Sequence, residues 1–210
     1  MMRYFTLLTL CVIAGCASKN VEPAWRGNAA GALDSFTAEY LAGNSALAAS
    51  DFARARGEMA STGRADLVAH AELVRCAVKT ASLELGECAG FTPLALDATP
   101  AERAYAAYLA GQWQGLDIAL LPPQHQLVAR GGALTAVADP LARLVAAGAL
   151  LQVGRIAPAD IDTAIDTASG QGWRRPLLVW LGVAAQRAKA GGNAAELARL
   201  ARRIALAEGK

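Results

Sequence analysis

Aromatic side chains and alternating β-branched residues are both scarce in this 210-residue sequence. Only 6% of the residues are aromatic, and no run alternates Val, Ile or Thr with polar residues as a half-buried strand would. Hydrophobic residues make up 54% of the chain, and much of that fraction is alanine, the strongest helix former. We therefore predict an all-α protein.

An excess of charge of one sign is also lacking. Lys and Arg number 20 against 18 Asp and Glu, so the formal net charge is only +2 at pH 7. Such a balance produces no field that would attract nucleic acid. The one local excess of cations lies near the end of the chain, around Arg199, Arg202 and Arg203. We interpret it as a solvated helix face, with contact to anionic lipid or an acidic partner as the alternative.

Catalytic and metal-binding motifs are absent as well. The chain has no Gly-x-Ser-x-Gly, no phosphate loop, no His-Glu-x-x-His and no Ser-x-x-Lys. Its two histidines, His70 and His125, have no second metal ligand at helical spacing. We place His70 at a helix interface and His125 in a proline-rich turn, with a metal or base role as the alternative. We expect no enzymatic activity, cofactor or metal site.

The first sixteen residues carry the most specific pattern. Arg3 precedes the apolar run Phe5–Ala14, and small residues follow it, as in a secretory signal. About ten apolar residues are half of the roughly 20 that span a bilayer. The segment Ile13-Ala14-Gly15-Cys16 resembles the lipobox of bacterial lipoproteins, which implies removal of residues 1–15 and fatty acylation (diacylglycerol and palmitate) of Cys16. The alternative is a plain secretory signal that is cut elsewhere.

The same resemblance implies a location for the mature protein. In that family an aspartate directly after the cysteine favours retention in the inner membrane, whereas here Ala17 and Ser18 follow. The resemblance thus implies a lipid anchor in the outer membrane, on the periplasmic side. We divide the mature chain into a lipidated cysteine and tether over residues 16–27 and a single α-helical domain over residues 28–210.

Two cysteines, Cys76 and Cys88, remain in the predicted domain, and we expect a disulfide between them in the oxidising periplasm. One unbroken helix would separate their Cα atoms by roughly 18 Å, whereas a disulfide needs about 4.4–6.8 Å. The helix must therefore end near Ser82–Gly86 and the chain must fold back. A redox-active pair is disfavoured because the spacing is not Cys-x-x-Cys.

Start and stop signals divide the domain into eight or nine helices. Thr99 with Glu102, and Asn193 with Glu196, form predicted capping boxes, and Asp139-Pro140 opens another helix. Predicted helix starts near residues 139, 158, 175 and 193 give a helix pair about every 36 residues. This interval resembles the 34-residue tetratricopeptide repeat, and Trp180, Ala184 and Gly191 match its packing positions. We expect antiparallel helix hairpins in a tetratricopeptide-like array or an irregular helical bundle.

Two groups of side chains are candidates for recognition. Tryptophan and arginine often anchor interfaces, so one candidate partner surface consists of Trp173, Arg174 and Arg175. The alternative is that the tryptophan packs between repeats and stacks on its own arginine. The second group is an aromatic cluster that we place in the core rather than in a ligand site, namely Tyr105, Tyr108 and Trp113.

Stacked helix hairpins leave grooves that bind peptides or partner helices. We therefore expect an outer-membrane-anchored periplasmic scaffold or adaptor in cell-envelope assembly, with a protein partner in the envelope. The alternative is a helical carrier of a small apolar ligand or lipid, which would use a cavity between alanine-lined helices.

Overall fold

A computed structural model describes residues 23–209 of the chain. The predicted signal peptide, Cys16 and most of the predicted tether lie outside these residues. The described part is helical without strands, which confirms the all-α prediction. Its α-helices are α1 (Ala24–Ala42), α2 (Ser45–Ala60), α3 (Ala65–Ala81), α4 (Pro100–Leu109), α5 (Pro123–Ala129), α6 (Pro140–Gln152), α7 (Pro158–Gly170), α8 (Arg174–Ala190) and α9 (Ala194–Glu208).

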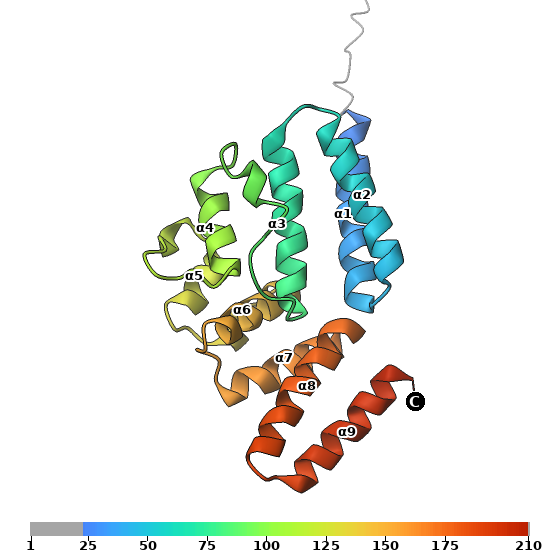
Figure 1. The fold of residues 1–210 in the computed structure, drawn as a ribbon, viewed down its shortest axis with the longest axis vertical. Coiled ribbons are helices and arrows are strands. Elements are labelled where there is room, and N and C mark those ends of the chain that lie inside the picture. Colours follow the sequence, from blue (N-terminus) through green and yellow to red (C-terminus); the bar gives the residue numbers. More distant parts are fainter. Residues whose placement is uncertain (1–22, 210) are drawn as a thin grey trace, which may run out of the picture.

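The long helix α3 lies at the centre of the arrangement. Helices α1 and α2 form a hairpin on one side of it, and α4 and α5 lie on the other side (Figure 1). Helices α6 to α9 pack consecutively across the lower end, and α8 returns to contact α1 (Figure 1). This is a bundle of antiparallel hairpins, as expected.

Helix α3 separates two hydrophobic clusters. Val68, Ala71 and Val78 face the first cluster, which α1 and α2 share. Ala69 and Leu73 face the second and larger cluster, which holds the buried residues of α4 to α8. Apolar residues on two faces of this helix are therefore buried, and α3 joins the N-terminal hairpin to the rest of the domain.

The first helix begins earlier than expected. We placed the start of the helical domain at residue 28, but α1 runs from Ala24, directly after Pro23. The additional turn contains Trp25, which packs partly buried against the first cluster. Burial of this large side chain stabilises the turn, so the helix takes in residues that we assigned to the tether.

Two close contacts fix the C-terminal helices against α3. Gly148 of α6 lies against the Thr80 carbonyl, and a Cβ atom at this position would collide with that oxygen. The fully buried Trp180 of α8 donates its indole N–H to the carbonyl oxygen of Ala81 at 3.2 Å. Both contacts lie at the C-terminal end of α3, which therefore forms the junction between the two halves of the molecule.

The predicted disulfide between Cys76 and Cys88 is present, with the two Cα atoms 5.5 Å apart. Helix α3 ends at Ala81, and the chain reverses through Leu83, which has a positive φ of 58°. The connection to α4 contains only one short 3-10 turn, Thr92–Leu94. The disulfide attaches this irregular segment to the helix that precedes it.

Helix capping follows the predicted signals with one exception. Thr99 and Glu102 form the complete capping box of α4, and Asp139 caps α6 by accepting from the Ala142 amide at 2.7 Å. At α9, Asn193 accepts from the Glu196 amide at 3.0 Å, but the Glu196 carboxylate binds the guanidinium of Arg199 instead of closing the box. The backbone N–H of Asn193 donates to the Ala188 carbonyl oxygen at 2.9 Å, so it does not need the Glu196 carboxylate as an acceptor.

Candidate ligand-binding cavity

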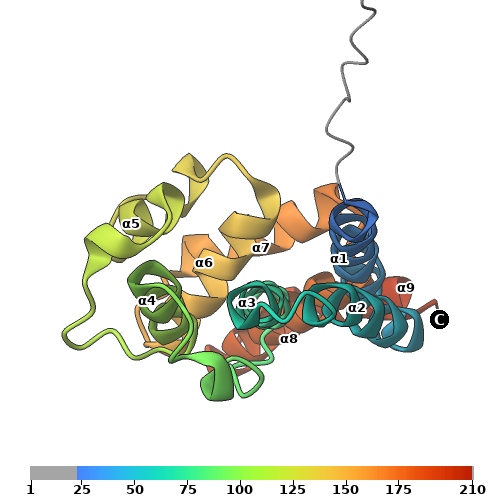
Figure 2. The ribbon, with the colours of Figure 1, turned by 90° about the horizontal axis from the view of Figure 1, so that it is seen from above.

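A cavity of about 500 Å³ lies between helices α3, α4, α5 and α6. Figure 2 shows α4 and α5 beside α3 and α6 when the molecule is seen from above. We call the pocket that the side chains of these four helices line the α3–α6 cavity. Its volume falls within the roughly 300–1,000 Å³ that is typical of small-molecule sites.

The walls of the α3–α6 cavity are mainly aliphatic. Helix α3 contributes side chains at helical spacing, the segment before α5 contributes two leucines and a proline, and α6 closes the opposite side. The principal wall residues are Leu73, Val74, Ala77, Leu121, Leu141 and Val145. Alanine and valine on facing helices leave space that larger side chains would fill, which explains why the cavity forms here.

An aromatic cluster forms the inner wall. Tyr105 and His125 line the cavity, with ring centroids 5.3 Å apart. Tyr108 stacks on Trp113 at 5.0 Å behind them, and the Trp113 indole N–H donates to the Tyr108 carbonyl oxygen at 2.9 Å. The predicted core role is thus found for Tyr108, which is fully buried. Tyr105 has both roles, since it packs on the core and faces the cavity.

His125 is the most unusual polar residue of the cavity. Its side chain is only 2% exposed, its Nε2 lies 3.4 Å from the Tyr105 hydroxyl, and its Nδ1 has no hydrogen-bond partner. Burial lowers the pKa of His125 to about 4, although the nearby charge of Asp139 opposes the shift. The imidazole is therefore neutral at physiological pH and leaves one ring nitrogen without a partner.

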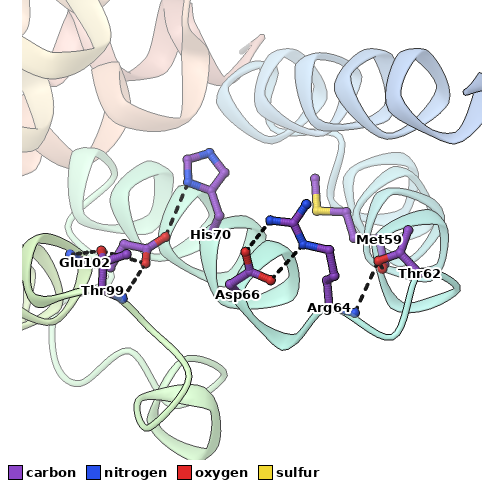
Figure 3. Close-up of polar contacts among 7 residues, drawn as sticks. All are labelled: Met59, Thr62, Arg64, Asp66, His70, Thr99 and Glu102. Atoms are coloured by element: carbon purple, nitrogen blue, oxygen red, sulfur yellow. Dashed lines mark hydrogen bonds and ion pairs between the residues drawn. The ribbon is translucent and has the colours of Figure 1, made fainter. Parts of the chain in front are cut away.

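Among the described residues, the carboxylates that line the cavity lie at its solvent-accessible mouth, where Glu102 is half-buried and Asp139 is exposed. The carboxylate of Glu102 accepts from the amide and hydroxyl of Thr99 and lies 4.0 Å from the ring of His70, whose side chain is 61% exposed (Figure 3). Arg64 and Asp66 form a separate ion pair one turn away on α3, with a shortest distance of 2.6 Å (Figure 3). His70 thus lies at a helix interface, as expected, and at the rim of the cavity.

The candidate partner surface at residues 173–175 lies at the start of α8. Trp173 is half-buried against both hydrophobic clusters, while Arg174 is exposed. Arg175 points back to the N-terminal hairpin, where its Nε donates to the Tyr40 carbonyl at 2.7 Å and its guanidinium donates to Ser45 at 2.6 Å. Trp173 and Arg175 therefore take part in contacts within the chain, and the guanidinium of the exposed Arg174 lies beside Gly43, where a Cβ atom would come within 3.2 Å of it.

A network around Glu84 continues this contact. Arg175 lies 4.2 Å from the ring centroid of Tyr40 and 3.7 Å from the Glu84 carboxylate. Tyr40 donates its hydroxyl to Glu84, and Lys79 pairs with the same carboxylate at 3.2 Å. Burial raises the pKa of Glu84, but the hydrogen bonds from Tyr40 and Lys79 outweigh it and hold that pKa below its usual value. The network ties α1, α3 and α8 together.

Comparisons with family models, with curated proteins and with solved structures find no match for this chain. Within residues 23–209, no helix has both the length and the hydropathy that a bilayer crossing requires. The same residues contain no group of three or more His, Cys, Asp or Glu side chains that could hold a metal ion. The α3–α6 cavity has the volume and the apolar lining of a small-molecule site.

Proposed function

We propose that this protein binds a small, mainly apolar ligand in the α3–α6 cavity, and that it does so as a lipid-anchored periplasmic protein of the outer membrane. The observation that carries the proposal is the cavity itself, which has about 500 Å³ of space between aliphatic walls. Such walls favour an apolar ligand because each Å² of apolar surface removed from water contributes roughly 25 cal/mol. Its few polar groups are confined to the mouth and to the inner wall, where they would orient a ligand.

The carrier role is better supported than the scaffold or adaptor role. The large exposed hydrophobic residues of the described part, among them Leu47, Leu96 and Leu206, are spread over separate elements. Single exposed leucines are ordinary on protein surfaces, whereas partner-binding sites form contiguous patches. The hairpins supply a scaffold, and the aliphatic side chains that line the α3–α6 cavity offer an apolar surface to a ligand. The proposal involves binding without catalysis.

Displacement of a neutral fluorescent probe tests the proposal. The chain carrying Cys16→Ser is used, because removal of the predicted acylation site avoids detergent that would compete for the cavity. N-phenyl-1-naphthylamine, which is apolar and uncharged, should bind saturably with a stoichiometry near one. Native mass spectrometry of protein extracted from its membrane should then show a retained small molecule of defined mass.

A matched pair of variants locates the binding site. Ala101 and Ala159 are both exposed alanines that follow the first proline of a helix, but only Ala101 lines the cavity. Ala101→Trp should weaken probe binding at least tenfold by occupying the cavity, and Ala159→Trp should leave it unchanged. Absence of saturable binding, or equal loss in both variants, would contradict the proposal. Reproducible crosslinking to one envelope protein without any retained ligand would instead support the adaptor role.

A further inference from the structure

The charges around the α3–α6 cavity are all of one sign. Glu102 and Asp139 both line it, and no Lys or Arg occurs among the described residues that do so. His70 and His125 also line it but count as neutral in the formal charge at pH 7. The lining therefore has a formal charge of −2, from two carboxylates.

The arginines nearest in sequence to these carboxylates do not neutralise them. Arg103, next to Glu102, donates to the carbonyl oxygens of Ala95 and Ala98. Arg143, one turn after Asp139, donates through two nitrogens to the Val137 carbonyl, at 2.9 and 2.7 Å. Arg143 also donates to the Thr167 hydroxyl at 3.2 Å. Both guanidinium groups are therefore bonded to groups other than the two carboxylates, and neither of these arginines lines the cavity.

Arg64 is close to the mouth but is also engaged elsewhere. It forms a two-pronged contact with Asp66, at 3.2 and 2.6 Å, separate from the Glu102 carboxylate (Figure 3). An anionic ligand group at the mouth would thus meet two carboxylates without a neighbouring cation directed toward it.

The helix ends reduce the negative charge but do not cancel it. Glu102 lies in the first turn of α4, and Asp139 caps α6. A helix N-terminus carries roughly half a positive charge, so the ends of α4, α6 and the short α5, whose first turn also lines the cavity, offset at most about 1.5 of the two negative charges. The mouth thus keeps a net negative charge.

The inner wall offers no site for an anion either. His125 is buried and neutral, and its unpartnered Nδ1 supplies hydrogen-bonding capacity without charge. Tyr105, beside it, presents an aromatic ring to the cavity. Aromatic faces attract ammonium groups and repel anions, because the ring carries negative charge density on its faces.

We infer that the ligand of the α3–α6 cavity is a cationic amphiphile, with its apolar part between the aliphatic walls and its positive group at the mouth beside Glu102 and Asp139. This inference rests on the proposed function, since it assigns a ligand class to the same cavity. It disfavours fatty acids and other anionic lipids as ligands, although these have the apolar tails that the walls accept.

Three twelve-carbon probes that differ in their head groups test the inference. Dodecyltrimethylammonium, dodecanol and dodecanoate are compared, each below its critical micelle concentration, as competitors of the neutral fluorophore. The cation should bind about tenfold more tightly than the alcohol, since opposite charges a few ångströms apart near a protein surface gain roughly this factor. Dodecanoate should bind most weakly. Added salt should reduce the differences in affinity between the three probes, because it screens charges at a mouth that is open to solvent.

Isosteric substitutions then assign the preference to the two carboxylates. The double variant Glu102→Gln and Asp139→Asn removes both charges but keeps the side-chain oxygens that cap α4 and α6. It should bind the cation and the alcohol with equal affinity. The control, Asp160→Asn with Glu196→Gln, makes the same charge change in the first turns of α7 and α9, away from the cavity. It should keep the tenfold difference.

The outcomes separate the inference from the proposed function. Equal binding of all three probes, or tighter binding of dodecanoate, would overturn the inference and leave the cavity as an apolar ligand site. Persistence of the cation preference in the Glu102 and Asp139 double variant would overturn the assignment to these residues. Failure of every probe, the neutral fluorophore included, would refute the proposed function itself. Thermal unfolding of each variant verifies that the helices remain folded.

Discussion

Protonation of the buried imidazole of His125 should make the protein unstable in mild acid. The pKa of His125 is lowered from 6.5 to about 4 by burial, so the unfolded chain binds a proton at higher pH than the native chain does. Stability is therefore complete above pH 6.5 and decreases as the pH falls toward 4. At 1.36 kcal/mol per pH unit, the interval between the unfolded pKa of 6.5 and the native pKa of about 4 corresponds to a loss of about 3 kcal/mol in the free energy of unfolding. About 2 kcal/mol of this should already be lost between pH 7 and pH 5.

Urea denaturation at pH 7, 6 and 5 measures this loss. The His125→Phe variant keeps a ring against Tyr105 and Tyr108 but cannot titrate, so its loss of stability between pH 7 and pH 5 should be smaller than that of the wild type by about 2 kcal/mol. His70→Gln is the control for removal of a histidine, because that side chain is 61% exposed and the variant leaves His125 in place. An equal loss in wild type and His125→Phe would refute the reasoning.

Three further predictions concern contacts that hold the helices together, each measured as the free energy of unfolding in urea. Gly148→Ala should cost about 2 kcal/mol because its methyl group collides with the Thr80 carbonyl, whereas Gly182→Ala in the open part of α8 should be neutral or stabilising by up to about 1 kcal/mol. Replacing both Cys76 and Cys88 by Ser should lower the free energy of unfolding by about 3 kcal/mol, as expected for a loop of this length. Reduction of the wild type should add two hydrogens to its mass, and an unchanged mass would mean that the two thiols are free. Arg175→Met should cost about 2 kcal/mol through its lost bonds to Tyr40 and Ser45, and a cost as small as that of Arg174→Met would contradict this role.

Features that depend on a few neighbouring residues could be predicted from the sequence. The capping box at Thr99 and the cap at Asp139 are formed because each needs only residues within one helical turn. The disulfide was expected because Cys76 and Cys88 are the two cysteines that remain in the predicted periplasmic domain. A continuous helix would hold them too far apart, so this expectation required α3 to end a few residues after Cys76, and it ends at Ala81.

Features that depend on competition between partners were predicted less well. Asn193 caps α9, but the expected return bond from Glu196 is not formed, since Arg199 takes its carboxylate and the Ala188 carbonyl satisfies the Asn193 amide. Arg175 was a candidate for a partner surface, yet it bonds to Tyr40, which is 135 positions away in the sequence. No local pattern of residues contains such a long-range partner.

The α3–α6 cavity shows the limit of prediction from a single sequence most clearly. Leu73, Tyr105, His125 and Val145 come from four helices, and each alone fits an ordinary core position of its own helix. A cavity arises only when helices of fixed length meet with side chains too small to fill the space between them. That mismatch depends on how closely the helices approach, and here the approach is set elsewhere, by Gly148 against α3. The sequence shows His125 only as a histidine shortly after two prolines, whereas its burial and its unpartnered Nδ1 are properties of the folded residues 23–209.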